Sequence, residues 1–164
     1  MVLIGVSLKQ NLEKRGNMYK NIVATTDGSE FAERGLVHAF QLAKAVGAKV
    51  TVVTVTAPYS VSGLPGGWTD SPAFIERFEQ EWKDFADTTL IRARELAVEA
   101  GCEVHTLHVV EQHPATAIIE SATELGSDLI VMASNGRRGF KGLLLGSQTY
   151  EVVTRSTIPV LVVR

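Results

Sequence analysis

The chain has 164 residues and a mass of 17.8 kDa, which is typical of one compact domain. Hydrophobic residues make up 45% of the sequence, and this content excludes a disordered chain, which lacks the apolar side chains that build a core. The formal net charge is −2, so no basic surface field attracts the protein to nucleic acid or to an anionic membrane, and we expect neither as a partner.

A single cysteine, Cys102, excludes a disulfide-stapled secreted scaffold and a cysteine-based zinc site. No apolar run reaches the ~18 residues that a membrane-spanning helix needs. His105 and His108 are three residues apart in a predicted strand and therefore point to opposite faces, unlike a pair of metal ligands. We accordingly expect a cytoplasmic protein without a metal site of its own.

Residues 1–17 differ in pattern from the rest of the chain. Met18 opens a charged lead-in to an apolar strand, which is how small α/β domains usually begin. We expect residues 1–17 to be an N-terminal extension, with Met18 as a candidate native start, and residues 18–164 to form the domain. The alternative is that Val2–Ser7 adds an edge strand to the sheet.

From Met18 onward, short apolar runs alternate with segments of helical period. The apolar runs predict strands at Asn21–Thr26, Lys49–Ala57, Glu103–Val110, Asp128–Ala133 and Ile158–Val163. The periodic segments predict helices from Ser29 or Glu30 to Val46, at Phe74–Ala100, at His113–Glu124 and at Ser147–Arg155. This order predicts an α/β fold in which helices cover both faces of a parallel sheet. Ligands of such sheets bind at the carboxyl ends of the strands, so Asp27, Val55 and Ala133 are candidate walls of a site.

The segment Pro58–Ala73 is a sixteen-residue connection between the second strand and the second helix. Loops this long are uncommon in compact domains and often act as lids over a site. The alternative is a variable insertion without a function.

A glycine cluster follows the fourth strand, since four of the fourteen glycines fall between Gly136 and Gly146. Glycines let backbone amides approach a ligand closely, and the unpaired amides of a helix that starts at Ser147 attract phosphate. Ser147 and Thr149 add hydroxyl donors, and local positive charge comes from Arg137, Arg138 and Lys141. The pattern predicts a phosphate site that is neither a Walker A loop nor a Gly-x-Gly-x-x-Gly fingerprint. The alternative is that the glycines serve only turns and a helix cap.

The same segment resembles the nucleotide-binding motif of the universal stress protein family, Gly-x2-Gly-x9-Gly-[Ser/Thr]. This chain has Ala133, Gly136, Gly146 and Ser147 at those four positions. Thr26–Glu30, His113-Pro114 and the strand Ile158–Val163 are also similar to the family, and the resemblance covers nearly all of residues 18–164. It implies a Rossmann-like, adenine-nucleotide alpha hydrolase-like sheet with strand order 3-2-1-4-5 and a homodimer formed through Ile158–Val163.

The resemblance also implies that the protein binds ATP or AMP, with Mg²⁺ as a companion of the phosphates. Asp27 would lie by the ribose, Val55 would offer backbone contacts to adenine, and the amides of Gln148 and Thr149 would hold the phosphates. The implied nucleotide-binding residues are Thr26, Asp27, Val55, Met132, Ala133, Gly136, Arg137, Gly146, Ser147, Gln148 and Thr149. No catalytic residue is expected, because Asp27 is the only carboxylate that can be placed near the site and it would face the ribose.

Ala133 departs from the family pattern at its first glycine, where the backbone would pass close to the ribose. An extra methyl group there costs about 1–3 kcal/mol if it overpacks the site, and little if the backbone shifts. The function that this pattern favours is a nucleotide-binding stress-response or signalling module, whose occupancy changes its dimer or its choice of an unknown protein partner. The alternatives are a slow ATPase or self-phosphorylating enzyme, and a nucleotide-free interaction protein, which Ala133 would support.

Overall fold

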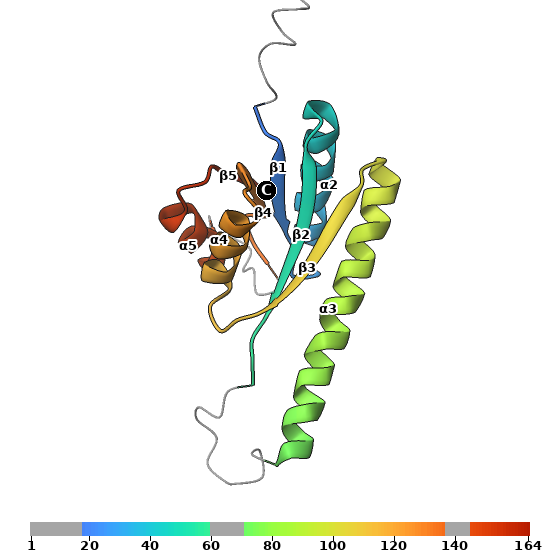
Figure 1. Cartoon of the computed structure of the whole chain (residues 1–164), viewed down its shortest axis with the longest axis vertical. Coiled ribbons are helices and arrows are strands. Elements are labelled where there is room, and N and C mark those ends of the chain that lie inside the picture. Colours follow the sequence, from blue (N-terminus) through green and yellow to red (C-terminus); the bar gives the residue numbers. More distant parts are fainter. Residues whose placement is uncertain (1–17, 60–70, 137–144) are drawn as a thin grey trace, which may run out of the picture.

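The computed structural model describes residues 18–59, 71–136 and 145–164, which form a five-stranded sheet with helices on both faces (Figure 1). The predicted extension 1–17 and most of the predicted lid Pro58–Ala73 lie outside the described residues. In chain order the elements are β1 (Asn21–Thr25), α2 (Glu30–Val46), β2 (Lys49–Thr56), α3 (Pro72–Ala100), β3 (Val104–Val110), α4 (Pro114–Glu124), β4 (Leu129–Ala133), α5 (Ser147–Arg155) and β5 (Val160–Val163).

All strand pairs are parallel and the strand order is β3-β2-β1-β4-β5, so the predicted fold class and topology are confirmed. The order switches direction between β1 and β4, and ligands of open α/β sheets bind at such a point. Asp128 fixes these two strands at their other ends, because its carboxylate oxygens accept hydrogen bonds from the amides of Lys20, at 2.8 Å, and Asn21, at 3.2 Å.

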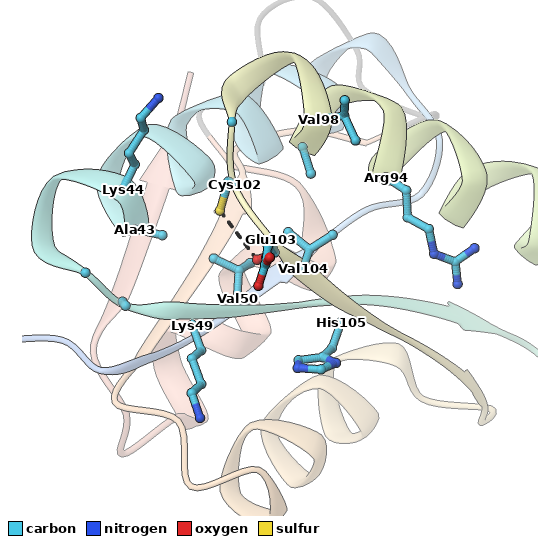
Figure 2. A pocket seen from close by; sticks show the side chains of 14 residues that line it. Ala43, Lys44, Lys49, Val50, Arg94, Val98, Cys102, Glu103, Val104 and His105 are labelled. Atoms are coloured by element: carbon cyan, nitrogen blue, oxygen red, sulfur yellow. Dashed lines mark hydrogen bonds between the residues drawn. The ribbon is translucent and has the colours of Figure 1, made fainter.

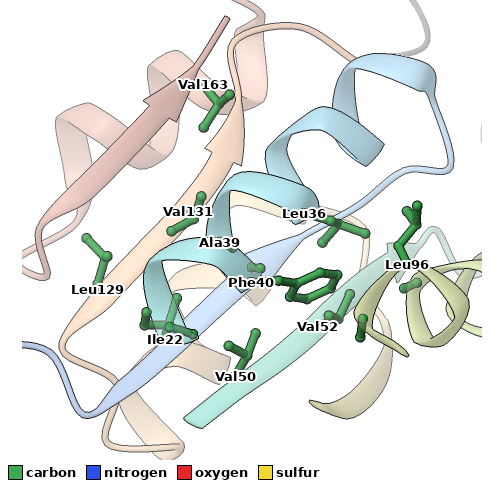
Figure 3. Close-up of a cluster of buried hydrophobic side chains, with 14 of the residues drawn as sticks. Ile22, Leu36, Ala39, Phe40, Val50, Val52, Leu96, Leu129, Val131 and Val163 are labelled. Carbon is green, nitrogen blue, oxygen red and sulfur yellow. The ribbon is translucent and has the colours of Figure 1, made fainter. Parts of the chain in front are cut away.

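The two faces of the sheet carry separate hydrophobic clusters. α2 and α3 cover one face, where Phe40 of α2 is completely buried against β1 and β2 (Figure 3). α4 and α5 cover the other face over Val23 and Ile130. Successive residues of a strand point to opposite faces, so Val131 faces α2 while Met132 lies in the second cluster.

The helix ends follow local capping chemistry, and several predicted boundaries are corrected. α4 begins at Pro114, with His113 as its N-cap, and β5 begins at Val160 rather than at Ile158. Ser29 caps α2 as predicted, because its hydroxyl accepts a hydrogen bond from the amide of Ala32 at 3.2 Å. α3 begins at Pro72 rather than at Phe74, so the connection after β2 is shorter than predicted. The side chain of Ser71 caps this start by accepting from the amide of Phe74 at 3.3 Å, and proline favours the first position of a helix.

Candidate functional site

The turn after β1 holds the carboxylate of Asp27 at the carboxyl end of the sheet. The amide of Thr26 donates to the carbonyl of Val53 at 3.0 Å and so extends the pairing of β1 with β2 by one residue. The amide of Gly28 then donates to the hydroxyl of Thr26 at 3.2 Å, and the amide of Ser29 donates to Asp27 Oδ1 at 3.1 Å. These bonds leave Asp27 little freedom to turn, because one of its carboxylate oxygens is bound to its own loop.

Gly136, after β4, lies directly against Asp27. A Cβ atom added to Gly136 would be 2.4 Å from Asp27 Oδ2, well inside van der Waals contact. The predicted first and fourth strand ends therefore meet, and only a residue without a side chain fits at position 136 without displacing the carboxylate.

The start of α5 is the third part of the site. Its N-cap is Gly146, whose amide donates to the carbonyl of Ser134 at 2.7 Å, and no side chain caps the helix. The first amides of a helix have no partner within it and carry a partial positive charge. Ser147 and Gln148 in this first turn are exposed, so the helix start is accessible to an anionic group.

Two side chains of this turn are used for structure rather than for a ligand. The hydroxyl of Thr149 is buried and donates to the carbonyl of Ala133 at 2.9 Å, so this hydroxyl is engaged within the protein, while the Thr149 amide remains the predicted phosphate donor. The side chain of Gln148 turns to α4, where its Oε1 accepts from the amide of Ala115 at 3.0 Å. Both contacts leave the backbone amides and the exposed hydroxyl of Ser147 as the groups that this turn can offer to a ligand.

Ala133 directs its methyl group into the core and not into the site. Its Cβ lies 3.7 Å from the position that a Cβ of Gly35 in α2 would occupy, and the residue is buried. The strand alternation that points Val131 to α2 points Ala133 the same way, and this direction argues against the predicted intrusion at the ribose. The methyl fits because the facing helix residue is a glycine.

The other predicted residues lie at the same edge or outside the described chain. Val55 is half-buried in β2, two residues beyond the carbonyl that binds Thr26. Met132 buries its side chain under α4 and α5, so only its backbone can contribute to a ligand contact. Arg137, like Arg138 and Lys141, is outside the described residues.

The sequence reading missed Gly35 and Ser134. Ser134 joins the parts of the site, since its amide donates to the carbonyl of Val163 at 2.7 Å and its carbonyl accepts from Gly146. An isolated glycine inside a helical pattern signals a close backbone approach, so Gly35 could have been found. Nothing in the sequence indicated the role of Ser134.

A cavity of about 710 Å³ lies at the other end of the strands, beside the amino ends of β2 and β3 and between the last turns of α2 and α3 (Figure 2). Three lysine and arginine side chains line it: Lys44 Nζ donates to the carbonyl of Ala100 at 3.2 Å, Arg94 donates to Thr106, and Lys49 is exposed. Burial raises the pKa of the Cys102 thiol, so this side chain is protonated near neutral pH and is a poor nucleophile. The helix start that has no side-chain cap lies elsewhere, at the carboxyl ends of β1 and β4.

Two further properties concern the described part of the chain. None of its helices combines the length and the apolar character needed to cross a membrane. Within residues 18–59, 71–136 and 145–164, no three His, Cys, Asp or Glu side chains are grouped so that they could hold a metal ion.

Comparison with known proteins identifies the family of this chain. The model of the universal stress protein family matches residues 18–164. Universal stress protein MJ0531 of Methanocaldococcus jannaschii is 35% identical over 90% of this chain and 84% of its own. YxiE of Bacillus subtilis, a universal stress protein, is 34% identical over 90% of this chain and its own full length.

Solved structures agree with this match. The structure of MJ0577 superposes with a TM-score of 0.75 at 29% identity and covers 89% of this chain and 96% of that one. A universal stress protein in complex with cAMP superposes with a TM-score of 0.69 at 29% identity and covers 90% of this chain and 98% of that one. The universal stress protein from Archaeoglobus fulgidus in complex with dAMP superposes with a TM-score of 0.59 at 25% identity. The match covers 90% of this chain and 99% of that one. The fold, the family match and the related sequences together show that the chain belongs to the universal stress protein family.

Proposed function

We propose that this protein binds an adenine nucleotide, ATP or AMP, at the carboxyl ends of β1 and β4 and acts as a stress-response or signalling module. The observation that carries the proposal is the contact of Asp27 with Gly136 beside the uncapped start of α5. A carboxylate that accepts hydroxyl groups and a helix start that donates to anions complement the two polar parts of a nucleotide, the ribose and the phosphates.

The described residues fit such a ligand. The phosphates would lie at the first-turn amides of Gln148 and Thr149, the ribose at Asp27, and adenine against the backbone of Val55. Gly136 leaves space for the ligand beside Asp27, because a side chain at that position would fill this space. Mg²⁺ would arrive with the phosphates of ATP, and the remaining proposed ligand-binding residues are Thr26, Met132, Ala133, Gly146, Ser147 and Arg137.

The related complexes with cAMP and dAMP support the adenine class of ligand. ATP is included in the proposal because the start of α5 has no side-chain cap and its first amides attract phosphate. Ala133 no longer favours a nucleotide-free protein, since its methyl group packs against α2. In this proposal residues 18–164 are the nucleotide-binding domain of a cytoplasmic protein, and occupancy biases its association with a protein partner.

The experiment is to purify the protein, denature it and separate the released small molecules by ion-exchange chromatography. A second sample is incubated with ATP and Mg²⁺ and followed for ADP. We expect released or exchangeable adenine nucleotide without turnover. Steady ADP formation that is lost in Ser147→Ala would instead favour an ATPase, and a protein that neither releases nor takes up nucleotide would refute the proposal.

We also propose a homodimer formed through Ile158–Val163. β5 is an edge strand of the sheet, and on α5 beside it Tyr150 is 63% exposed and Val153 is 44% exposed. The carbonyls of Pro159 and Val163 point to β4, so the strand alternation directs the backbone groups of Val160 and Val162 to the open edge.

Light scattering at micromolar concentration is expected to give the mass of a dimer for the wild-type protein. Val162→Pro should give a folded monomer, because proline removes the outward amide and leaves the bonds of Val163 to β4 in place. A wild-type monomer, or a Val162→Pro variant that stays dimeric, would argue against this interface.

A further inference from the structure

Gly35 brings the backbone of α2 unusually close to the end of β4. A Cβ atom added to Gly35 would lie 3.3 Å from the amide nitrogen of Ala133 and 3.7 Å from its Cα and Cβ atoms. Gly35 is itself buried in the middle of a 17-residue helix, where glycine is a poor helix former. The close packing of helix on strand accounts for glycine at this position.

Ala133 connects this contact to the start of α5. Its carbonyl accepts the buried hydroxyl of Thr149 at 2.9 Å, and Thr149 belongs to the first turn of α5. The next residue, Ser134, accepts the amide of Gly146, the N-cap of the same helix, at 2.7 Å. The consecutive carbonyls of Ala133 and Ser134, at the end of β4, thus hold Thr149 and Gly146. These two residues bound the turn that offers its amides to an anion.

We propose that Gly35 is a positioning residue for the phosphate-binding turn. Its missing side chain sets how closely β4 approaches α2, and the carbonyls of Ala133 and Ser134 pass that position on to α5. This inference rests on the proposed function for its effect on affinity. The claim that Gly35 sets the position of α5 does not depend on a ligand, because every contact in it is between protein atoms.

The test compares Gly35→Ala with Gln41→Ala, an exposed position of the same helix that does not face β4. The added methyl group of Gly35→Ala must move Ala133 by a few tenths of an ångström, while alanine favours the helix, so the two effects on stability oppose each other. We expect a melting temperature within about 3 °C of wild type but affinity for AMP about tenfold weaker in calorimetry.

Amide NMR spectra of the ligand-free proteins separate this inference from the proposed function. Gly35→Ala should shift the amide signals of Ser134, Gly146 and Thr149, and Gln41→Ala should leave them in place. Thr149→Val should also shift Gly146 and weaken AMP binding, whereas Thr149→Ser, which keeps the hydroxyl, should restore both. If Gly35→Ala leaves the signals of α5 unchanged, the positioning role is overturned, even where AMP binds; if they shift and wild type binds no AMP, only the proposed function fails.

Discussion

Gly136→Ala is expected to weaken adenine-nucleotide binding about 100-fold, because the new methyl group and Asp27 cannot both keep their positions. The Cβ atom would lie 2.4 Å from Asp27 Oδ2, and the bond from the amide of Ser29 to Oδ1 opposes rotation of the carboxylate away from it. Either Asp27 leaves the ribose position or the chain after β4 moves away from α5. Isothermal titration calorimetry with ATP or AMP measures the loss.

Gly126→Ala is the matched control, because it makes the same substitution before β4, at the opposite end of this strand. The Cβ atom that it adds would have no atom within 4 Å, so the φ of +59° costs some stability while the Asp27 contact stays untouched. Its affinity should stay within about threefold of wild type, a change of less than 1 kcal/mol. Equal losses in the two variants would mean that the site is not built around the Asp27–Gly136 contact.

Phe40→Ala is expected to lower the free energy of unfolding by about 3–5 kcal/mol, the usual cost of deleting a buried phenyl ring. Phe40 is 0% exposed and lies in the cluster between α2, α3 and the sheet (Figure 3). For a chain of this length the melting temperature should fall by about 10 °C. Thermal unfolding followed by circular dichroism measures this shift.

Phe31→Ala tests whether the effect comes from burial. Phe31 lies in the first turn of the same helix, is 39% exposed and has the guanidinium of Arg34 5.3 Å from its ring centroid. Its removal should cost about 1–2 kcal/mol, less than the loss at Phe40, since the ring is only partly buried and an exposed cation–π contact is weak. Similar losses for the two variants would place the main core elsewhere than against Phe40.

The sequence predicted the architecture well because its signals are local. Apolar runs predict the strands, and helical periods predict the helices. Ser29 and Gly47, as the N-cap and C-cap residues, predict the two ends of α2. The early start of α3 was missed although Ser71 and Pro72 are also a local signal. Prolines and glycines in one segment are typical of a loop, but proline at a first helical position favours the helix.

The site was predicted less completely, because spacing along the chain does not show where a side chain points. Asp27 and Gly136 were both candidates, but their contact depends on the pairing of β1 with β4. The direction of the Ala133 methyl group and the burial of the Thr149 hydroxyl depend on α2 and α5 packing around the end of β4. These are tertiary contacts, and no local pattern contains them.

The most direct test of the central claim is an amide NMR titration of the wild-type protein with ATP and with AMP. The account predicts that the largest shifts fall on Asp27, Gly136, Gly146, Gln148 and Thr149, on the turns that meet at the carboxyl ends of β1 and β4. Shifts confined to the opposite cavity, at Gly101, Cys102 and Val104, or no shifts at millimolar nucleotide, would contradict it.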